Sequence, residues 1–289
     1  MDFKTSFSKI LDTVNSWVDE LSPKGDGLHK IIFEASNYSV QAGGKRIRPI
    51  IAYGICDMLG GNVENVKHYA CAVEFIHTYS LIHDDLPCMD NDDFRRGMPT
   101  NHKKYGEAIA LLAGDSLLTH AFDCASSSTN GAEITVKAIN AISKAAGVHG
   151  MIGGQVIDIE GAKTYDELKT VHKMKTGALI RLSAYLGGIA AECDEKSLKK
   201  IDEFADNLGI AFQIKDDILD VESTDAELGK PTGSDDKRGL TTYVTLFGTE
   251  GAKEKLAEHT LLAKKALESF GDKAEFLLNL SDMLLARKN

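Results

Sequence analysis

Two clusters of aspartate are the residues in this sequence with the clearest potential for chemistry. The first, in residues 80–96, places five carboxylates within ten residues and follows them with Arg95 and Arg96. The second, in residues 212–220, carries three more. Carboxylates this close together repel one another unless solvent separates them or cations bind among them. Such hard oxygen ligands suit Mg²⁺, which takes one or two carboxylates and completes its shell with water and phosphate oxygens. Taken alone, the first cluster is also compatible with an acidic surface turn.

The spacing within each cluster predicts how its carboxylates are placed. Each cluster follows an apolar helical run that delivers a pair of adjacent aspartates. Asp216 and Asp220 are four residues apart and therefore share one face of a helix. Asp84 and Asp90 are six apart, and Pro87 between them predicts that the helix ends there and a loop brings Asp90 back. The two clusters are therefore expected to face each other across a cavity.

The two motifs, their order and the lysines between them resemble the short-chain trans-prenyl diphosphate synthases, the farnesyl and geranylgeranyl diphosphate synthase family. The resemblance extends from about Gly43 to the C-terminus. It implies an all-α fold, a single-domain helical bundle around a deep central cavity. It also implies condensation of isopentenyl diphosphate with an allylic diphosphate, several Mg²⁺ ions per site with Mn²⁺ as an alternative, and a homodimer.

By this resemblance, metal ligands lie in both motifs and at one position between them. Asp84, Asp90 and Asp216 are expected to hold the metal directly, with Asp85 and Asp217 in support. The expected metal-binding set is Asp84, Asp85, Asp90, Asp158, Asp216, Asp217 and Asp220, the last of these through metal-bound water.

The resemblance also assigns the residues that bind the substrates. Those expected to bind isopentenyl diphosphate are Lys45, Arg48, His77 and Arg96. Those expected at the allylic diphosphate and the reacting carbons are Arg95, Gln155, Lys175, Thr176, Gln213 and Lys230. Of these, Lys175, Thr176, Gln213 and Lys230 are expected to be catalytic, together with Asp84 and Asp216. Arginine suits such sites because its planar guanidinium binds phosphate oxygens in pairs. Without the family context, Lys45 and Arg48 are equally compatible with a solvated basic turn.

Product length is expected to depend on the residues one helical turn before the first aspartate pair. Tyr79 and Ser80 precede Asp84 by five and four residues. The large ring of Tyr79 is predicted to stop elongation at fifteen carbons, giving farnesyl diphosphate, with geranylgeranyl diphosphate as the alternative product. An ordinary core tyrosine is the other interpretation of Tyr79.

One position departs from the family pattern. The family usually has a lysine shortly before a Thr-Tyr pair, where this chain has Leu240. Lys237 or Arg238 is a candidate for the missing charge. A non-catalytic regulatory subunit is therefore an alternative, although such subunits usually lose an aspartate motif. A terpene cyclase would not need the isopentenyl-binding residues. Arg287, near the C-terminus, is expected either to fold over the isopentenyl site or to be frayed terminal charge.

Composition narrows the class of protein further. The chain has 289 residues, 43% of them hydrophobic, and a net charge of −10 without a basic block, so nucleic acid is not an expected partner. Five widely spaced cysteines without a CxxC favour a reducing cytoplasm. No apolar run was expected to span a membrane.

Apolar spacing predicts helices throughout the chain, in one domain covering residues 1–289. The predicted helices are residues 3–21, 28–41, 50–59, 63–82, 106–126, 132–146, 148–160, one or two within 194–221, 243–247, 252–270 and 273–287, with a further helix that starts at Thr164 and carries Lys175. The long polar segment 222–239 is predicted to be a functional loop.

Overall fold

The computed structural model describes residues 2–222 and 241–287, and these residues are almost entirely helical. The described helices are, in chain order, α1 (Phe3–Leu21), α2 (Lys30–Gln41), α3 (Ile47–Met58), α4 (Lys67–Asp84), α5 (Asn101–Tyr105), α6 (Glu107–Ser126), α7 (Ala132–Ala146), α8 (Met151–Glu160), α9 (Tyr165–Val171), α10 (Ala178–Ala190), α11 (Glu195–Glu222), α14 (Tyr243–Leu267) and α15 (Glu275–Leu285). Shorter helical segments are η1 (Val63–Val66), η2 (His172–Gly177) and η3 (Glu268–Ala274). The all-α prediction is confirmed.

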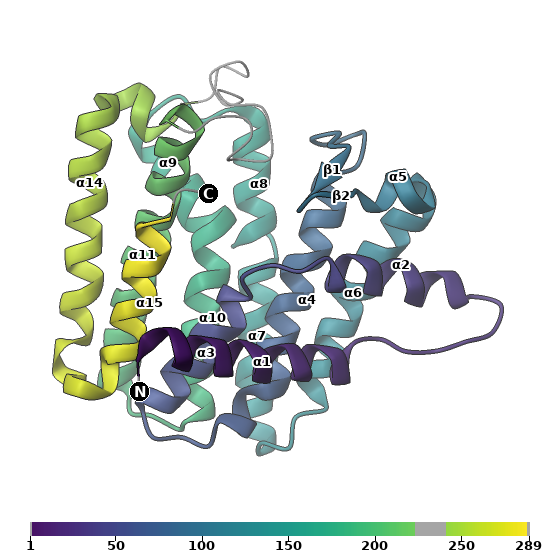
Figure 1. The fold of residues 1–289 in the computed structure, drawn as a ribbon, viewed down its shortest axis with the longest axis horizontal. Coiled ribbons are helices and arrows are strands. Elements are labelled where there is room, and N and C mark those ends of the chain that lie inside the picture. The colour runs from purple at the N-terminus through teal and green to yellow at the C-terminus, as the bar shows by residue number, and fades with distance from the viewer. Residues whose placement is uncertain (1, 223–240, 288–289) are drawn as a thin grey trace.

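The long helices lie side by side as a bundle, and α1 and α2 run across it (Figure 1). Helix α4 packs against α6, α10 against α3, and α11 against α14. At one end of the bundle, α4 leads into a hairpin of β1 (Phe94–Arg95) and β2 (Met98–Pro99) (Figure 1). This end of α4 carries the first aspartate cluster.

Helix α4 is surrounded by other helices. Eleven of its 18 residues are buried, so it has no continuous solvent face. That burial explains why apolar residues occur on all sides of the helix, without the usual amphipathic period. The main apolar core draws residues from Ile10 in α1 to Leu284 in α15. The central helix is therefore a rigid support for the aspartates at its end.

Most helix positions agree with the sequence, and the differences have local causes. The predicted capping box of Thr164 and Glu167 forms at the start of α9. Helix α3 starts at Ile47, before Pro49, because the first turn of a helix tolerates a residue without an N–H. The strands β1 and β2 and helix α5 were not predicted, since each is too short to show a period. Segments 194–221 and 243–267 each form one helix, the second broken at Gly248.

Helix α6 is the one described helix that is long and apolar enough to cross a membrane, by length and composition only. Core helices of soluble proteins pass the same test. Its buried residues include Ala113 and Leu117, and it packs against α4 in the main core. This packing accounts for its apolar composition.

Candidate active site

A cavity of about 550 Å³ lies between α4, α6 and α8 and is lined mainly by apolar side chains. Leu111 and Leu118 of α6 lie two turns apart on the wall, and Met151 and Val156 of α8 line it too. Its size is that of a small-molecule pocket. The predicted central cavity is therefore present, and it suits an apolar chain.

Tyr79 and Ser80 both line this cavity, as the prediction for chain-length residues requires. Tyr79 is 4% exposed and packs edge-on against the ring of His83, with centroids 5.7 Å apart. Its hydroxyl is buried and makes no hydrogen bond to any described residue. Five residues of helix place Tyr79 about 7.5 Å from Asp84 along the axis of α4.

Asp84, the last residue of α4, lines the same cavity. Gln155 Nε2 on α8 donates a hydrogen bond of 3.1 Å to its carboxylate. Burial raises the pKa of Asp84 to about 6, with Asp90 adding to the effect and Lys175 opposing it. The backbone N–H of Asp90 donates to the Asp84 carbonyl over 2.8 Å, so the loop returns as the Pro87 spacing predicted. The loop therefore brings the backbone of Asp90 back to the end of α4.

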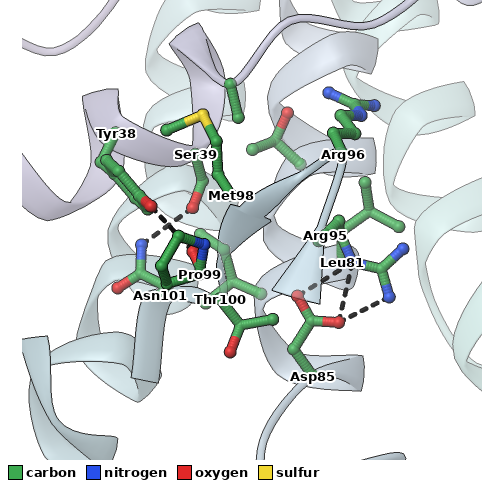
Figure 2. A pocket seen from close by; sticks show the side chains of 13 residues that line it. Tyr38, Ser39, Leu81, Asp85, Arg95, Arg96, Met98, Pro99, Thr100 and Asn101 are labelled. Carbon is green, nitrogen blue, oxygen red and sulfur yellow. Dashed lines mark hydrogen bonds and ion pairs between the residues drawn. The ribbon is translucent and has the colours of Figure 1, made fainter. Parts of the chain in front are cut away.

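Asp85 points away from the cavity and holds Arg95. The guanidinium of Arg95 donates three hydrogen bonds of 2.5–2.9 Å to the Asp85 carboxylate. Figure 2 shows the two side chains meeting beneath the hairpin, while Arg96 leaves the hairpin in another direction. Pairing with Asp85 raises the pKa of Arg95 against the opposing effect of burial. In this structure Asp85 therefore positions Arg95.

Helix α8 and the π-helical segment η2 together place Lys175 at the cavity. Lys175 Nζ donates to Asp158 over 2.5 Å, and Thr176 lines the cavity beside it. A π-helical turn inserts an extra residue and re-aims the side chains that follow, and such turns are frequent at functional sites. Asp158 and Gln155 share one face of α8, so one helix face contacts both Lys175 and Asp84.

The second aspartate motif lies near the end of α11. Gln213 Nε2 donates to Asp216 over 3.3 Å, within the same helix. The backbone N–H of Tyr243, the first residue of α14, donates to Asp217 over 2.8 Å. Asp217 and Asp220 are both buried. Asp217 thus joins the second motif to the start of α14.

A second cavity, of about 300 Å³, is strongly cationic. Its charged lining residues are Lys45, Arg46, Arg48, Glu74, Arg96 and Arg287. The excess of positive charge suits a polyanion such as a diphosphate. Burial lowers the pKa of Arg48 to about 10 although Glu74 opposes the effect, so the group stays protonated at neutral pH. The predicted residues for isopentenyl diphosphate therefore lie together.

Arg48 and His77 line both cavities, so the cationic pocket and the apolar cavity share a wall. Burial lowers the pKa of His77 well below its usual value, and Arg48 and Arg96 add to the effect. His77 is therefore neutral at neutral pH.

The turn before α3 brings Arg96 into the cationic pocket. Gly44 has φ of 131°, and a side chain there would collide with the Arg96 guanidinium at 2.7 Å. Arg96 Nη1 donates to the carbonyl of Gly43. The glycine pair thus provides both the backbone conformation and the space for Arg96.

Sequence reasoning missed the buried ion pair of Arg46 and Glu74. Their side chains are each 3% exposed and lie 2.7 Å apart. Arg46 also donates to Asn15 of α1 and to the carbonyl of Val40 in α2. Its φ of 47° is unusual for a residue with a side chain. Arg46 therefore fixes the turn that carries Lys45. Glu74, a carboxylate within the apolar run of residues 69–76, was the available signal in the sequence.

The carboxylates fit a divalent cation that is only partly coordinated by protein. No group of three or more potential ligands is preformed in the described residues. Mg²⁺ needs only one or two carboxylates, because water and phosphate oxygens complete its shell. Burial raises the pKa of Asp84 and the charge of Asp90 adds to the effect, so a bound cation would favour the ionised carboxylate. Lys230 and Leu240 lie outside the described residues.

The comparisons with known proteins agree with this geometry. A family model described as polyprenyl synthetase matches residues 29–277. The chain is 44% identical over 260 residues to farnesyl diphosphate synthase of Geobacillus stearothermophilus, covering 88% of each chain. It is 47% identical over 266 residues to the chloroplastic geranylgeranyl pyrophosphate synthase of Capsicum annuum, covering 90% of this chain and 72% of the relative. A crystal structure of geranyltransferase from Legionella pneumophila matches with a TM-score of 0.88 and 32% identity, covering 99% of this chain and 98% of the other. The chain therefore belongs to the polyprenyl synthetase family.

Proposed function

We propose that this protein is a prenyltransferase that condenses isopentenyl diphosphate with dimethylallyl and geranyl diphosphates, releasing diphosphate and giving farnesyl diphosphate. The observation that carries the proposal is the wall shared by the cationic pocket and the apolar cavity. A diphosphate held by Lys45, Arg48 and Arg96 leaves its apolar tail directed at the neighbouring cavity, where the allylic chain lies.

The cationic pocket on one side of this wall and the apolar cavity on the other suit the successive steps of the reaction. The allylic C–O bond breaks, and its electron pair leaves with diphosphate. The double bond of isopentenyl diphosphate then forms the new C–C bond, and a proton is lost from the adjacent carbon. Lys175 stabilises the leaving diphosphate, and the apolar cavity keeps water from the carbocation. A neutral His77 avoids adding a further positive charge next to the cation.

We expect a divalent metal ion, Mg²⁺ above all, to bind where the diphosphate leaves the allylic substrate. Asp84, Asp90 and Asp216 would hold it, and it would supply positive charge to the departing diphosphate. Gln155 and Gln213 orient two of these carboxylates by hydrogen bonds of 3.1 and 3.3 Å. Manganese, which has similar ligand preferences, is expected to substitute.

We further propose that the chain forms one domain and acts as a cytoplasmic homodimer. The core shared by α1 and α15 supports one domain, and five free cysteines suit a reducing compartment. Exposed apolar side chains gather on α6, α7 and α8: Leu111, Leu112, Val136, Ile152, Val156 and Ile159. Several of them also line the large cavity, so a second subunit on this face would close its wall. Light scattering after size-exclusion chromatography measures the mass, and a monomer would contradict this part.

Product analysis tests the proposed function. The purified protein is incubated with dimethylallyl diphosphate, labelled isopentenyl diphosphate and MgCl₂, and the chains are resolved after phosphatase treatment. A dominant fifteen-carbon alcohol is expected. A twenty-carbon product would keep the enzyme class and overturn the role given to Tyr79. Absence of product from any allylic starter, with the fold intact, would favour a regulatory subunit.

A further inference from the structure

Arg287, just beyond α15, contacts the second aspartate motif. Its Nη2 donates to Asp216 Oδ1 over 2.5 Å and to the carbonyl of Phe212 over 3.3 Å. The guanidinium carbon lies 3.8 Å from the centre of the Phe212 ring. The side chain is only 13% exposed. These contacts identify Arg287 as an ordered part of the site and not as frayed terminal charge.

The same side chain also lines the cationic pocket beside Lys45 and Arg48. Arg287 lowers the pKa of Lys45, in addition to the larger effect of burial, which shows that the two cations repel each other. Arg287 Nε is buried and makes no hydrogen bond to any described residue. One arginine thus lies between a carboxylate expected to bind metal and a pocket expected to bind diphosphate, with a donor still unused.

We propose that Arg287 couples the two binding sites by exchanging partners, pairing with Asp216 in the empty protein and with the diphosphate of isopentenyl diphosphate once Asp216 binds a divalent cation. This inference rests on the function proposed above. A dication at Asp216 takes up the carboxylate oxygens and repels the guanidinium. Arg287 then adds its charge to Lys45 and Arg48, and the pocket binds a polyanion more tightly.

Thermodynamic linkage makes this coupling reciprocal. If metal raises the affinity for isopentenyl diphosphate, then isopentenyl diphosphate raises the affinity for metal by the same factor. We expect a coupling of about tenfold, within the range typical of such linked sites. The coupling also favours filling of the metal-dependent allylic site together with the isopentenyl site.

Isothermal titration calorimetry without allylic substrate tests the coupling, because no turnover then occurs. Isopentenyl diphosphate is titrated into the full-length protein with and without saturating MgCl₂, using wild type, Arg287→Gln and Arg287→Lys. The control is Asp282→Asn in α15, which removes a 2.5 Å ion pair between Asp282 and Lys264 of α14. Chelation of Mg²⁺ by the free diphosphate is the same for all variants and cancels in the comparison.

In wild type and Asp282→Asn, we expect Mg²⁺ to strengthen binding about tenfold. In Arg287→Gln this gain should disappear, while Arg287→Lys should keep part of it. Mn²⁺ titrated alone, followed by the spin-resonance signal of the free ion, should bind Arg287→Gln more tightly than wild type. A purely structural arginine would instead weaken metal and diphosphate binding together.

An undiminished Mg²⁺-dependent gain in Arg287→Gln would overturn the inference, and so would weaker Mn²⁺ binding by that variant. Wild type that binds both ligands without mutual effect would contradict this coupling and leave the proposed function standing. Wild type that binds neither ligand would contradict both. If Arg287→Gln fails to fold, Arg287→Met, which also removes the charge, takes its place in the same titration and is compared with Arg287→Lys, which keeps the charge.

Discussion

Gly154→Ala should separate catalysis from folding. A Cβ at Gly154 would lie 2.3 Å from the backbone nitrogen of Lys175 and 2.8 Å from its Cα. Since a comfortable contact needs at least 3.4 Å, the π-helical segment must move about 1 Å away from α8. A displacement of that size at reacting groups can lower the rate about 100-fold. The backbone of Lys175 cannot avoid the methyl group by changing rotamer, so the displacement reaches both Lys175 and Thr176.

The cost in stability should be small by comparison. Crowding of a packed contact costs about 1–3 kcal/mol. Replacing a helical glycine by alanine returns up to about 1 kcal/mol. The net loss therefore lies between about 0 and 3 kcal/mol, which leaves the protein folded.

The assay is the initial rate of isopentenyl incorporation, with urea unfolding measured on the same samples. Gly131→Ala is the matched control, because a Cβ at Gly131 meets nothing within 4 Å. It should retain full rate. A folded Gly154→Ala variant with a rate near that of wild type would refute the argument that α8 fixes the position of Lys175.

Three further outcomes follow from single side chains. Tyr79→Ala should lengthen the main product from fifteen to twenty carbons, because the ring lines the cavity. A product chain of unchanged length in gas chromatography would contradict this. Glu74→Gln should lower the free energy of unfolding by about 3 kcal/mol at pH 7, because Arg46 then remains buried without its carboxylate. A loss below about 1 kcal/mol in urea unfolding would contradict this prediction. Burial lowers the pKa of His172 from 6.5 to about 4. Between these pH values the unfolded chain therefore binds a proton at His172 that the folded chain does not bind. The free energy of unfolding should fall by about 3 kcal/mol as the pH drops from 6.5 to 4. His172→Phe, which keeps a ring stacked on Tyr243, should not show this pH-dependent loss when unfolding is measured over the same pH range.

Local sequence signals were enough to predict most of the long helices and the ends of the helices that carry the two aspartate motifs. The capping box at Thr164 and the loop that returns Asp90 to Asp84 depend on residues close in the chain, and both form as predicted. Only the family resemblance predicted that Lys45, Arg48 and Arg96 act together, and the structure places them around one cationic pocket. Nothing in the local sequence brings Lys45 near Arg96, which lies on another element.

The partners of the buried charges could not be read from the sequence. Asp85 stands next to Asp84 in the motif, yet it binds Arg95 while Asp84 faces the cavity. This choice depends on the rotation of the last turn of α4 and on the position of the hairpin. Likewise, only the packed structure reveals that α8 approaches the π-helical segment closely at Gly154.

In the described structure, several cations of the site are already paired with carboxylates. The pairs, each 2.5–2.7 Å apart, are Arg46 with Glu74, Arg95 with Asp85, Lys175 with Asp158 and Arg287 with Asp216. Such pairing fixes the cations before any substrate binds, so little ordering remains to oppose binding. The pairing also weakens anion binding, because an incoming anion must compete with a carboxylate for each paired cation. A diphosphate bound together with a metal ion would compete successfully, because the ion would coordinate the carboxylates and the diphosphate would take their place beside the cations. The side chains of Arg46 and Glu74 are each only 3% exposed, so this pair is expected to persist and to hold the turn in place while the others exchange.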